Sequence, residues 1–251
     1  MKNQSNSTVP FILYLADNNL ILAQRNSEWC GHGPVLEQDI AITNITLDLI
    51  GQARMLYQLA ADHINRQNGN QDATEDTLAY LRNEREFSNV LMVELPKGHW
   101  GFTVLRQYLF SEFQYLLYRQ LSAHADEPLS AIAVKSLKEV TYHVQWSREW
   151  VLRLGDGTSE SHQKMADAVQ DIWMYTGELF QAAPFEDAAV LQSIHTEWKQ
   201  RITETLEEAT LTVPENVFMQ QGGKQGIHTE HLGYMLAEMQ YLQRMHPNAT
   251  W

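Results

Sequence analysis

The sequence predicts an all-α protein, and three observations support this class. Almost every segment repeats its apolar residues at helical spacing, whereas the alternation typical of β-strands is nearly absent. Only 7 Pro and 13 Gly occur among 251 residues, and they lie between the periodic segments. Because 44% of the residues are apolar, the chain can bury a sizeable core, and we expect one domain over residues 1–251.

The periodic segments give seven expected helices. Between the fourth and the fifth, the stretch LGDGTSES offers a Gly to end one helix and a Thr or Ser to cap the next. In the stretch GIHTEHLG, Thr229 is expected to cap the last helix, with Glu230 in its first turn. The expected helices cover residues 10–27, 35–64, 100–124, 129–155, 159–180, 187–211 and 229–246.

A long connection is expected between the second and third helices, at residues 65–99. It begins with the polar stretch NRQNGNQDATED and includes a short helical piece within DTLAYLRNEREFSNVLMVEL. Two helices, a long crossover and two more helices are the connectivity of ferritin-like proteins. We therefore expect a ferritin-like four-helix bundle with additional C-terminal helices.

Composition excludes several classes of function. The formal net charge is −13, so the surface should repel phosphate, and neither nucleic acid nor an anionic membrane is an expected partner. No apolar run approaches the roughly 20 residues that span a bilayer. Cys30 is the one cysteine, which rules out an internal disulfide and favours a reducing compartment. We expect a cytoplasmic protein.

Each of the first four long helices carries a stripe that is apolar at its ends and polar near its middle. Burying a lone carboxylate is costly, so these polar groups are expected to meet in the core and satisfy one another. His143, as an imidazolium, could bridge two of the carboxylates. The polar positions are Asn19 in the first helix, Asp48 and Gln52 in the second, Glu112 in the third, and Glu139 and His143 in the fourth.

This set resembles a di-metal site but is short of ligands. A carboxylate-bridged di-metal centre needs a Glu from each of two helices and a Glu-x-x-His pair from each of the other two. Here Val140 stands three residues before His143, and Glu139 is one position off. A metal-free polar network is therefore favoured over a working di-metal centre. A third alternative, in which some of these side chains face solvent, stays open.

Several long segments resemble one known family. They are SEWCGHGPVLEQDIAITNITLDLIGQAR, LRNEREFSN, VELPKGHW, KEVTYHVQWSREWVLRLGDGT and GIHTEHLGYMLAEMQYLQR, and the similarity covers essentially the whole chain. They resemble the C-subunit family of bacterial phenylacetyl-CoA epoxidase, also called ring-1,2-phenylacetyl-CoA monooxygenase. The resemblance implies a ferritin-like subunit that pairs with a related catalytic A subunit. That partner carries a di-iron centre, uses O2, and receives electrons from a separate reductase.

The resemblance also implies which positions of this chain align with the metal ligands of the catalytic paralogue. Where the catalytic paralogue has a KEESFH-like stretch, KEVTYH stands here, so its ligand Glu falls on Val140 and its ligand His on His143. The ligand pair of its second helix aligns with positions within DLIGQ, which places Leu49 and Gln52 at ligand positions. Iron-ligand roles therefore do not transfer to this chain, and we expect it to bind no cofactor itself.

The sequence as a whole favours a non-catalytic structural subunit of the epoxidase, with the di-iron A subunit as partner and the reductase as an indirect one. A homodimer of the isolated chain is also conceivable. The first alternative is a di-metal oxygenase or oxidase in its own right, using Asp48, Glu112, Glu139 and His143. The second is an independent binding or ferritin-type storage protein.

Overall fold

The structure is a computed structural model that describes residues 5–247 and 249. It confirms the all-α class, since the described part contains helices and no strand. The α-helices are α1 (Ser5–Ser27), α2 (Leu36–Asn68), α3 (Glu75–Tyr80), α4 (Trp100–Leu121), α5 (Glu127–Gly155), α6 (Ser159–Trp173), α7 (Ala188–Glu208), α8 (Glu230–Met239) and α9 (Tyr241–Met245). Short 3-10 turns occur at Glu84–Glu86, Leu91–Glu94, Gly177–Phe180 and Gly223–Gln225.

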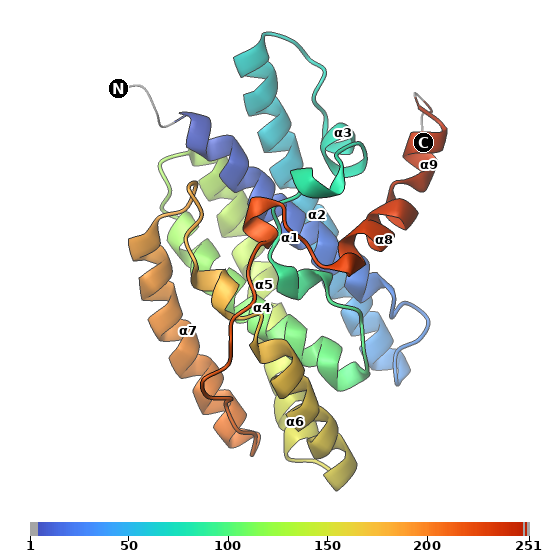
Figure 1. The fold of residues 1–251 in the computed structure, drawn as a ribbon, viewed down its shortest axis with the longest axis vertical. Coiled ribbons are helices and arrows are strands. Elements are labelled where there is room, and N and C mark those ends of the chain that lie inside the picture. Colours follow the sequence, from blue (N-terminus) through green and yellow to red (C-terminus); the bar gives the residue numbers. More distant parts are fainter. Residues whose placement is uncertain (1–4, 248, 250–251) are drawn as a thin grey trace.

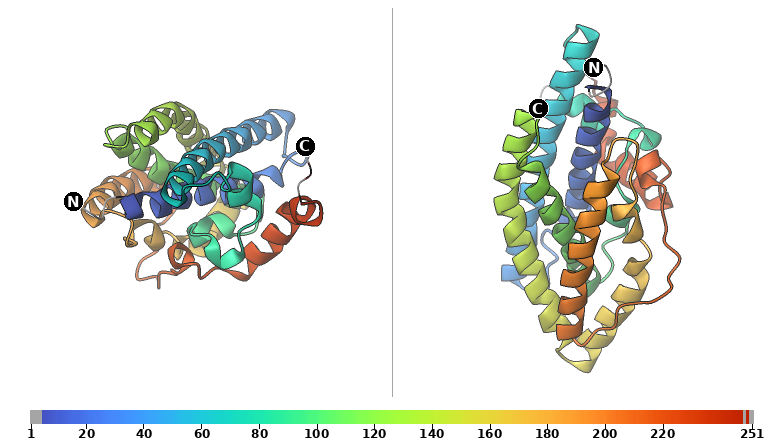
Figure 2. Two further views of the ribbon diagram at one scale, coloured as in Figure 1. Left: turned by 90° about the horizontal axis from the view of Figure 1, so that it is seen from above. Right: turned by 90° about the vertical axis from the view of Figure 1, so that its left-hand side faces the viewer.

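Four long helices pack together and define the core (Figure 1). Helix α1 packs along α2, α4 packs along α5, and α2 contacts α5 between the two pairs. Helices α6 and α7 cover α4 and α5 from the other side (Figure 2). Because α4 has neighbours in several directions, nearly all of its residues are buried, including polar ones such as Arg106, Gln107 and Ser111.

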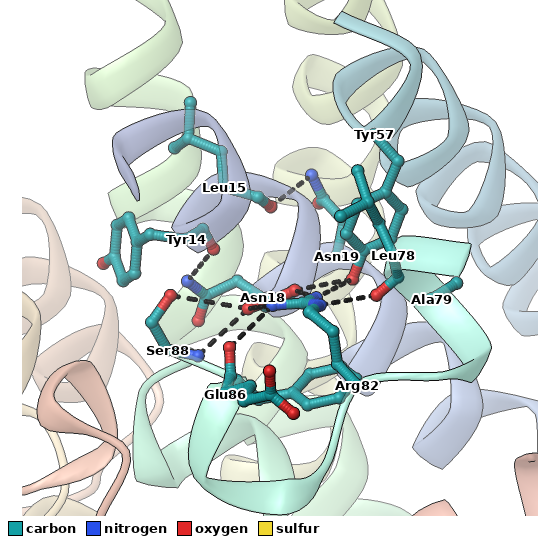
Figure 3. Close-up of polar contacts among 12 residues, drawn as sticks. Tyr14, Leu15, Asn18, Asn19, Tyr57, Leu78, Ala79, Arg82, Glu86 and Ser88 are labelled. Carbon is teal, nitrogen blue, oxygen red and sulfur yellow. Dashed lines mark hydrogen bonds and ion pairs between the residues drawn. The ribbon is translucent and has the colours of Figure 1, made fainter. Parts of the chain in front are cut away.

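The crossover between α2 and α4 is fastened to α1 by a buried acid, Asp17. Its carboxylate pairs with the guanidinium of Arg82 and accepts the hydroxyl of Tyr57 at 2.6 Å and the backbone N–H of Ser88 at 3.0 Å. Figure 3 shows Tyr57, Arg82 and Ser88 converging on this part of α1 from α2 and from the crossover. The Asp17 side chain is fully enclosed, so the contacts replace the water it loses on folding.

Two further buried ion pairs hold the chain after α6, one between two of its own segments and one to the crossover. Lys224 Nζ lies 2.7 Å from Glu186, and Lys224 also donates to the carbonyl of Gln181. Glu94, at the end of the crossover, pairs with His228 just before α8. Helices α8 and α9 then extend away from the four long helices (Figure 1).

Several expected helix limits agree with the structure, and others need correction. Thr158 and Thr229 cap α6 and α8 as expected, each accepting a backbone N–H of the first turn. The first helix begins earlier than expected, with Pro10 inside it.

Two expected helices were too long. The helix expected at 159–180 ends at Trp173, and a 3-10 turn follows only after a break. The last helix is broken at Gln240, whose side-chain amide donates to the carbonyls of Ala79 and Arg82. This contact with a distant segment is tertiary, so helical periodicity alone could not reveal it.

Candidate functional site: a polar network among the four long helices

A hydrogen-bonded network of neutral side chains lies where α1, α2 and α4 meet. The amide of Gln114 donates to Asn19 Oδ1 at 2.5 Å and to Gln52 Oε1 at 3.2 Å. Asn19 Nδ2 donates to the Tyr118 hydroxyl at 3.0 Å, and that hydroxyl lies 3.4 Å from Gln52 Oε1. All four side chains are almost completely enclosed. Burial raises the pKa of Tyr118 to about 12, so its hydroxyl keeps its proton and serves as a donor.

Two polar contacts join α2 to α5. Gln52 Nε2 donates to Glu139 Oε2 at 2.9 Å, and one turn earlier on α2, Asp48 Oδ2 lies 3.0 Å from His143 Nε2. Helices α2 and α5 run antiparallel, so the two contacts lie one helical turn apart. Asp48 and Gln52 are four residues apart on α2, as are Glu139 and His143 on α5. The His143 side chain is fully enclosed, whereas the Asp48 side chain is 35% exposed. His143 Nδ1 has no hydrogen-bond partner.

Glu112 lies apart from these groups, which corrects the expectation that three carboxylates meet in one core belt. Its nearest charged partner is Arg201 of α7, at 3.6 Å, on the side of α4 that α7 covers. Glu112 is 3% exposed, and Oε2 has no hydrogen-bond partner. Burial raises the pKa of its carboxyl, and the positive charges of Arg201 and Arg148 offset this only in part.

The donor set does not fit a di-metal centre. Val140 and Leu49 are fully buried apolar residues where the family resemblance places two ligands. Gln52 uses its amide N–H to hold Glu139, and Asn19 is a neutral amide held by Gln114. Among the residues that the structure describes, no three His, Cys, Asp or Glu side chains group in a way that could hold a metal ion. Apolar side chains and hydrogen-bonded amides thus occupy the positions where carboxylates and a second imidazole would be needed.

The sequence pattern did not point to Gln114 or Tyr118, although both are central to the network. The expected polar position on the third helix was Glu112 instead. Because α4 is buried on almost every side, its sequence has no clear polar face, and periodicity cannot tell which side meets α1 and which meets α7. A signal was present only in the four-residue spacing of Gln114 and Tyr118, which places them on one face.

Comparison of the sequence with known proteins places the chain in a family. The chain matches the phenylacetic acid catabolic protein family over residues 1–251. The chain therefore belongs to this family, and the resemblance seen in its sequence is confirmed. It is 44% identical over 253 residues to a protein of Escherichia coli (strain K12), the C subunit of 1,2-phenylacetyl-CoA epoxidase. That alignment covers 98% of this chain and 100% of the relative.

None of the helices that the structure describes is both long enough and apolar enough to cross a bilayer.

Proposed function

We propose that this chain is the structural C-type subunit of a phenylacetyl-CoA epoxidase, a single ferritin-like domain that scaffolds a di-iron catalytic subunit in the cytoplasm. The observation that carries the proposal is the end-to-end 44% identity to a relative named as the C subunit of that epoxidase. A lettered subunit implies other chains, so the other components are the expected partners.

The core of the chain supports a role without chemistry of its own. Residues at the positions equivalent to metal ligands are Leu49, Gln52 and Val140, which offer no charged donor. The remaining His143 contacts Asp48 across the interface between α2 and α5. Such a core stabilises the fold, and the surface of that fold can bind a partner. Oxygen activation, by contrast, requires a metal or organic cofactor.

The competing proposal is a di-metal oxygenase built from Asp48, Glu112, Glu139 and His143 of this chain. The placement of Glu112 against Arg201 of α7 counts against it, because a bridged metal pair needs its carboxylates to face one site. A storage or binding protein has no specific observation in its favour.

Reconstitution tests the proposal. We expect the di-iron subunit and the reductase to epoxidise phenylacetyl-CoA at full rate only when this chain is added. We also expect the chain alone to hold far less than one iron per molecule by elemental analysis. Full activity with the chain omitted, or turnover by the chain alone, would refute the proposal. A chain that carries Val140→Ala serves as a control, because it should still support activity if residue 140 ligates nothing.

A further inference from the structure

Helix α4 buries an arginine, Arg106, most of whose hydrogen-bond donors are unused. Its side chain is fully enclosed, and Nη1 donates to the carbonyl oxygens of Leu95 and Pro96 at the end of the crossover. Nε and Nη2 have no hydrogen-bond partner among the residues that the structure describes. Because Nε carries one N–H and Nη2 carries two, three of the five N–H groups of a guanidinium lack an acceptor. A buried charge without a partner is very costly to a folded chain.

The charges around Arg106 do not balance it. Arg25, in the last turn of α1, lies close enough to disfavour the charged form of Arg106, and the carboxylate of Glu28 offsets this effect. Glu28 is already bound to Arg25, whose Nη1 lies 2.6 Å from Oε1. Lys97 adds a further positive charge, since its Nζ donates to the carbonyl oxygen of Glu28 at 3.1 Å. The cluster formed by Arg25, Glu28, Lys97 and Arg106 therefore holds three cationic side chains and one carboxylate.

Water and a small anion can both accept N–H groups in such a cluster, but they differ in charge. Burial lowers the pKa of Arg106 to about 9, with the charge of Arg25 as the second cause, so the guanidinium still carries its proton at pH 7. The carboxylate of Glu94, whose backbone carbonyl accepts Arg25 Nε, is committed to His228. Water would accept the hydrogen bonds and leave the excess positive charge in place, whereas an anion balances it as well.

We propose that the guanidinium of Arg106 binds a chloride ion in the folded chain, at a site between the end of α1, the end of the crossover and the first half of α4. The side chain is completely enclosed, which favours a compact ion over a metabolite that bears a carboxylate or a phosphate. Chloride has no N–H or O–H of its own and accepts the free donors of Nε and Nη2. The ion stabilises Arg106 in the position from which Nη1 holds the carbonyl groups of the crossover to α4.

Crystallography with bromide tests the site directly, because bromide replaces chloride and is located by its anomalous scattering. Crystals of the wild-type chain grown in sodium bromide should show an anomalous peak within hydrogen-bonding distance of Arg106 Nε and Nη2. Crystals of Arg106→Met should lack this peak. Ordered water in place of bromide at Nε and Nη2, or bromide on the surface only, would overturn the proposal.

Thermal unfolding tests the same site in solution. An ion that binds only the folded chain raises the melting temperature, here by about 3–5 °C for each tenfold rise in chloride above the dissociation constant. Sodium gluconate at equal ionic strength is the reference, because it separates chloride binding from general screening. Arg106→Met should abolish the difference between the two salts. It also removes an unpartnered buried charge, so its melting temperature in gluconate should at least equal that of wild type. Equal chloride dependence in both chains would refute the site.

Two further variants locate the effect within the cluster. Glu28→Gln removes the one carboxylate, so the excess positive charge grows and chloride affinity should rise by about threefold. Arg153→Met removes a positive charge that is 62% exposed on α5, and as the matched control it should leave the chloride dependence unchanged. Weaker chloride binding by Glu28→Gln, or loss of the effect in Arg153→Met, would place the ion elsewhere. These measurements are independent of epoxidase activity, by which the proposed function is tested.

Discussion

His228 Nδ1 lies 2.6 Å from Glu94 Oε1, and both side chains are completely enclosed. The other ring nitrogen, Nε2, lies 3.0 Å from the carbonyl oxygen of Phe87. A carboxylate and a carbonyl both accept hydrogen bonds, so both ring nitrogens must donate, which only the charged imidazolium can do. Burial alone would lower the pKa of His228, but the hydrogen bond and charge of Glu94 outweigh it and raise the pKa.

This pair makes stability depend on pH in one direction. A histidine whose folded pKa exceeds its unfolded value contributes stability that is complete below the unfolded value and is lost as pH rises through the folded one. His228→Gln should therefore lower the free energy of unfolding by about 3–5 kcal/mol at pH 6, because it leaves Glu94 without its charged partner. Urea unfolding should show this difference from wild type shrinking at alkaline pH. With His246→Gln, an exposed control, no such trend is expected.

Glu112 predicts a dependence of the same sign, because a pKa raised in the folded chain always makes stability fall as pH rises. Because burial raises the pKa of its carboxyl, the ionised form destabilises the folded chain at neutral pH, and this cost disappears as pH falls below the unfolded value near 4.5. Glu112→Gln is expected to raise the free energy of unfolding at pH 7 by about 1 kcal/mol, which is the scale of one buried hydrogen bond. Thermal melts at pH 7 and pH 4 measure the gain. An equal gain at both pH values would contradict the assignment.

The contact between Asp17 and Arg82 predicts a large and local loss of stability. Asp17→Ala leaves a mostly buried guanidinium unpaired and should cost about 3–5 kcal/mol. Since Arg82 belongs to the crossover, limited proteolysis of the variant should cut first within residues 70–99. Asp62→Ala breaks an exposed pair with Arg66 and should change neither measurement appreciably.

Restoring one metal ligand should not restore a metal site. Val140→Glu places a carboxylate at a fully buried position, so we expect it to destabilise the chain without binding iron. Elemental analysis after growth with excess iron tests this, and Val140→Leu controls for the change in volume. Stoichiometric iron in the Val140→Glu variant would show that the remaining residues still form a competent site.

The sequence predicted the fold class and the long helices well, because apolar spacing and capping residues are local signals. Thr158 and Thr229 are examples, since each caps the helix that its position in the sequence indicated. His143 was expected to bridge two carboxylates, and it contacts one of them, Asp48.

The prediction failed where partners come from distant segments. Glu112 was expected beside Glu139, but Arg201 of α7 lies on the other side of α4, and no local pattern links residues 112 and 201. The pairing of Glu94 with His228 spans 134 residues and was missed for the same reason. Helix α4 is buried too uniformly for its sequence to indicate which neighbour each face contacts.

The network of Asn19, Gln52, Gln114 and Tyr118 has a consequence for how the protein is made. In many metalloproteins the binding free energy of the ion is part of the folding free energy, so the chain must wait for its metal. Here neutral amides and a hydroxyl form hydrogen bonds with one another in the core, and all of these groups belong to the polypeptide itself. We therefore expect the chain to reach its final shape in a cell starved of iron, before a metal-dependent partner is complete.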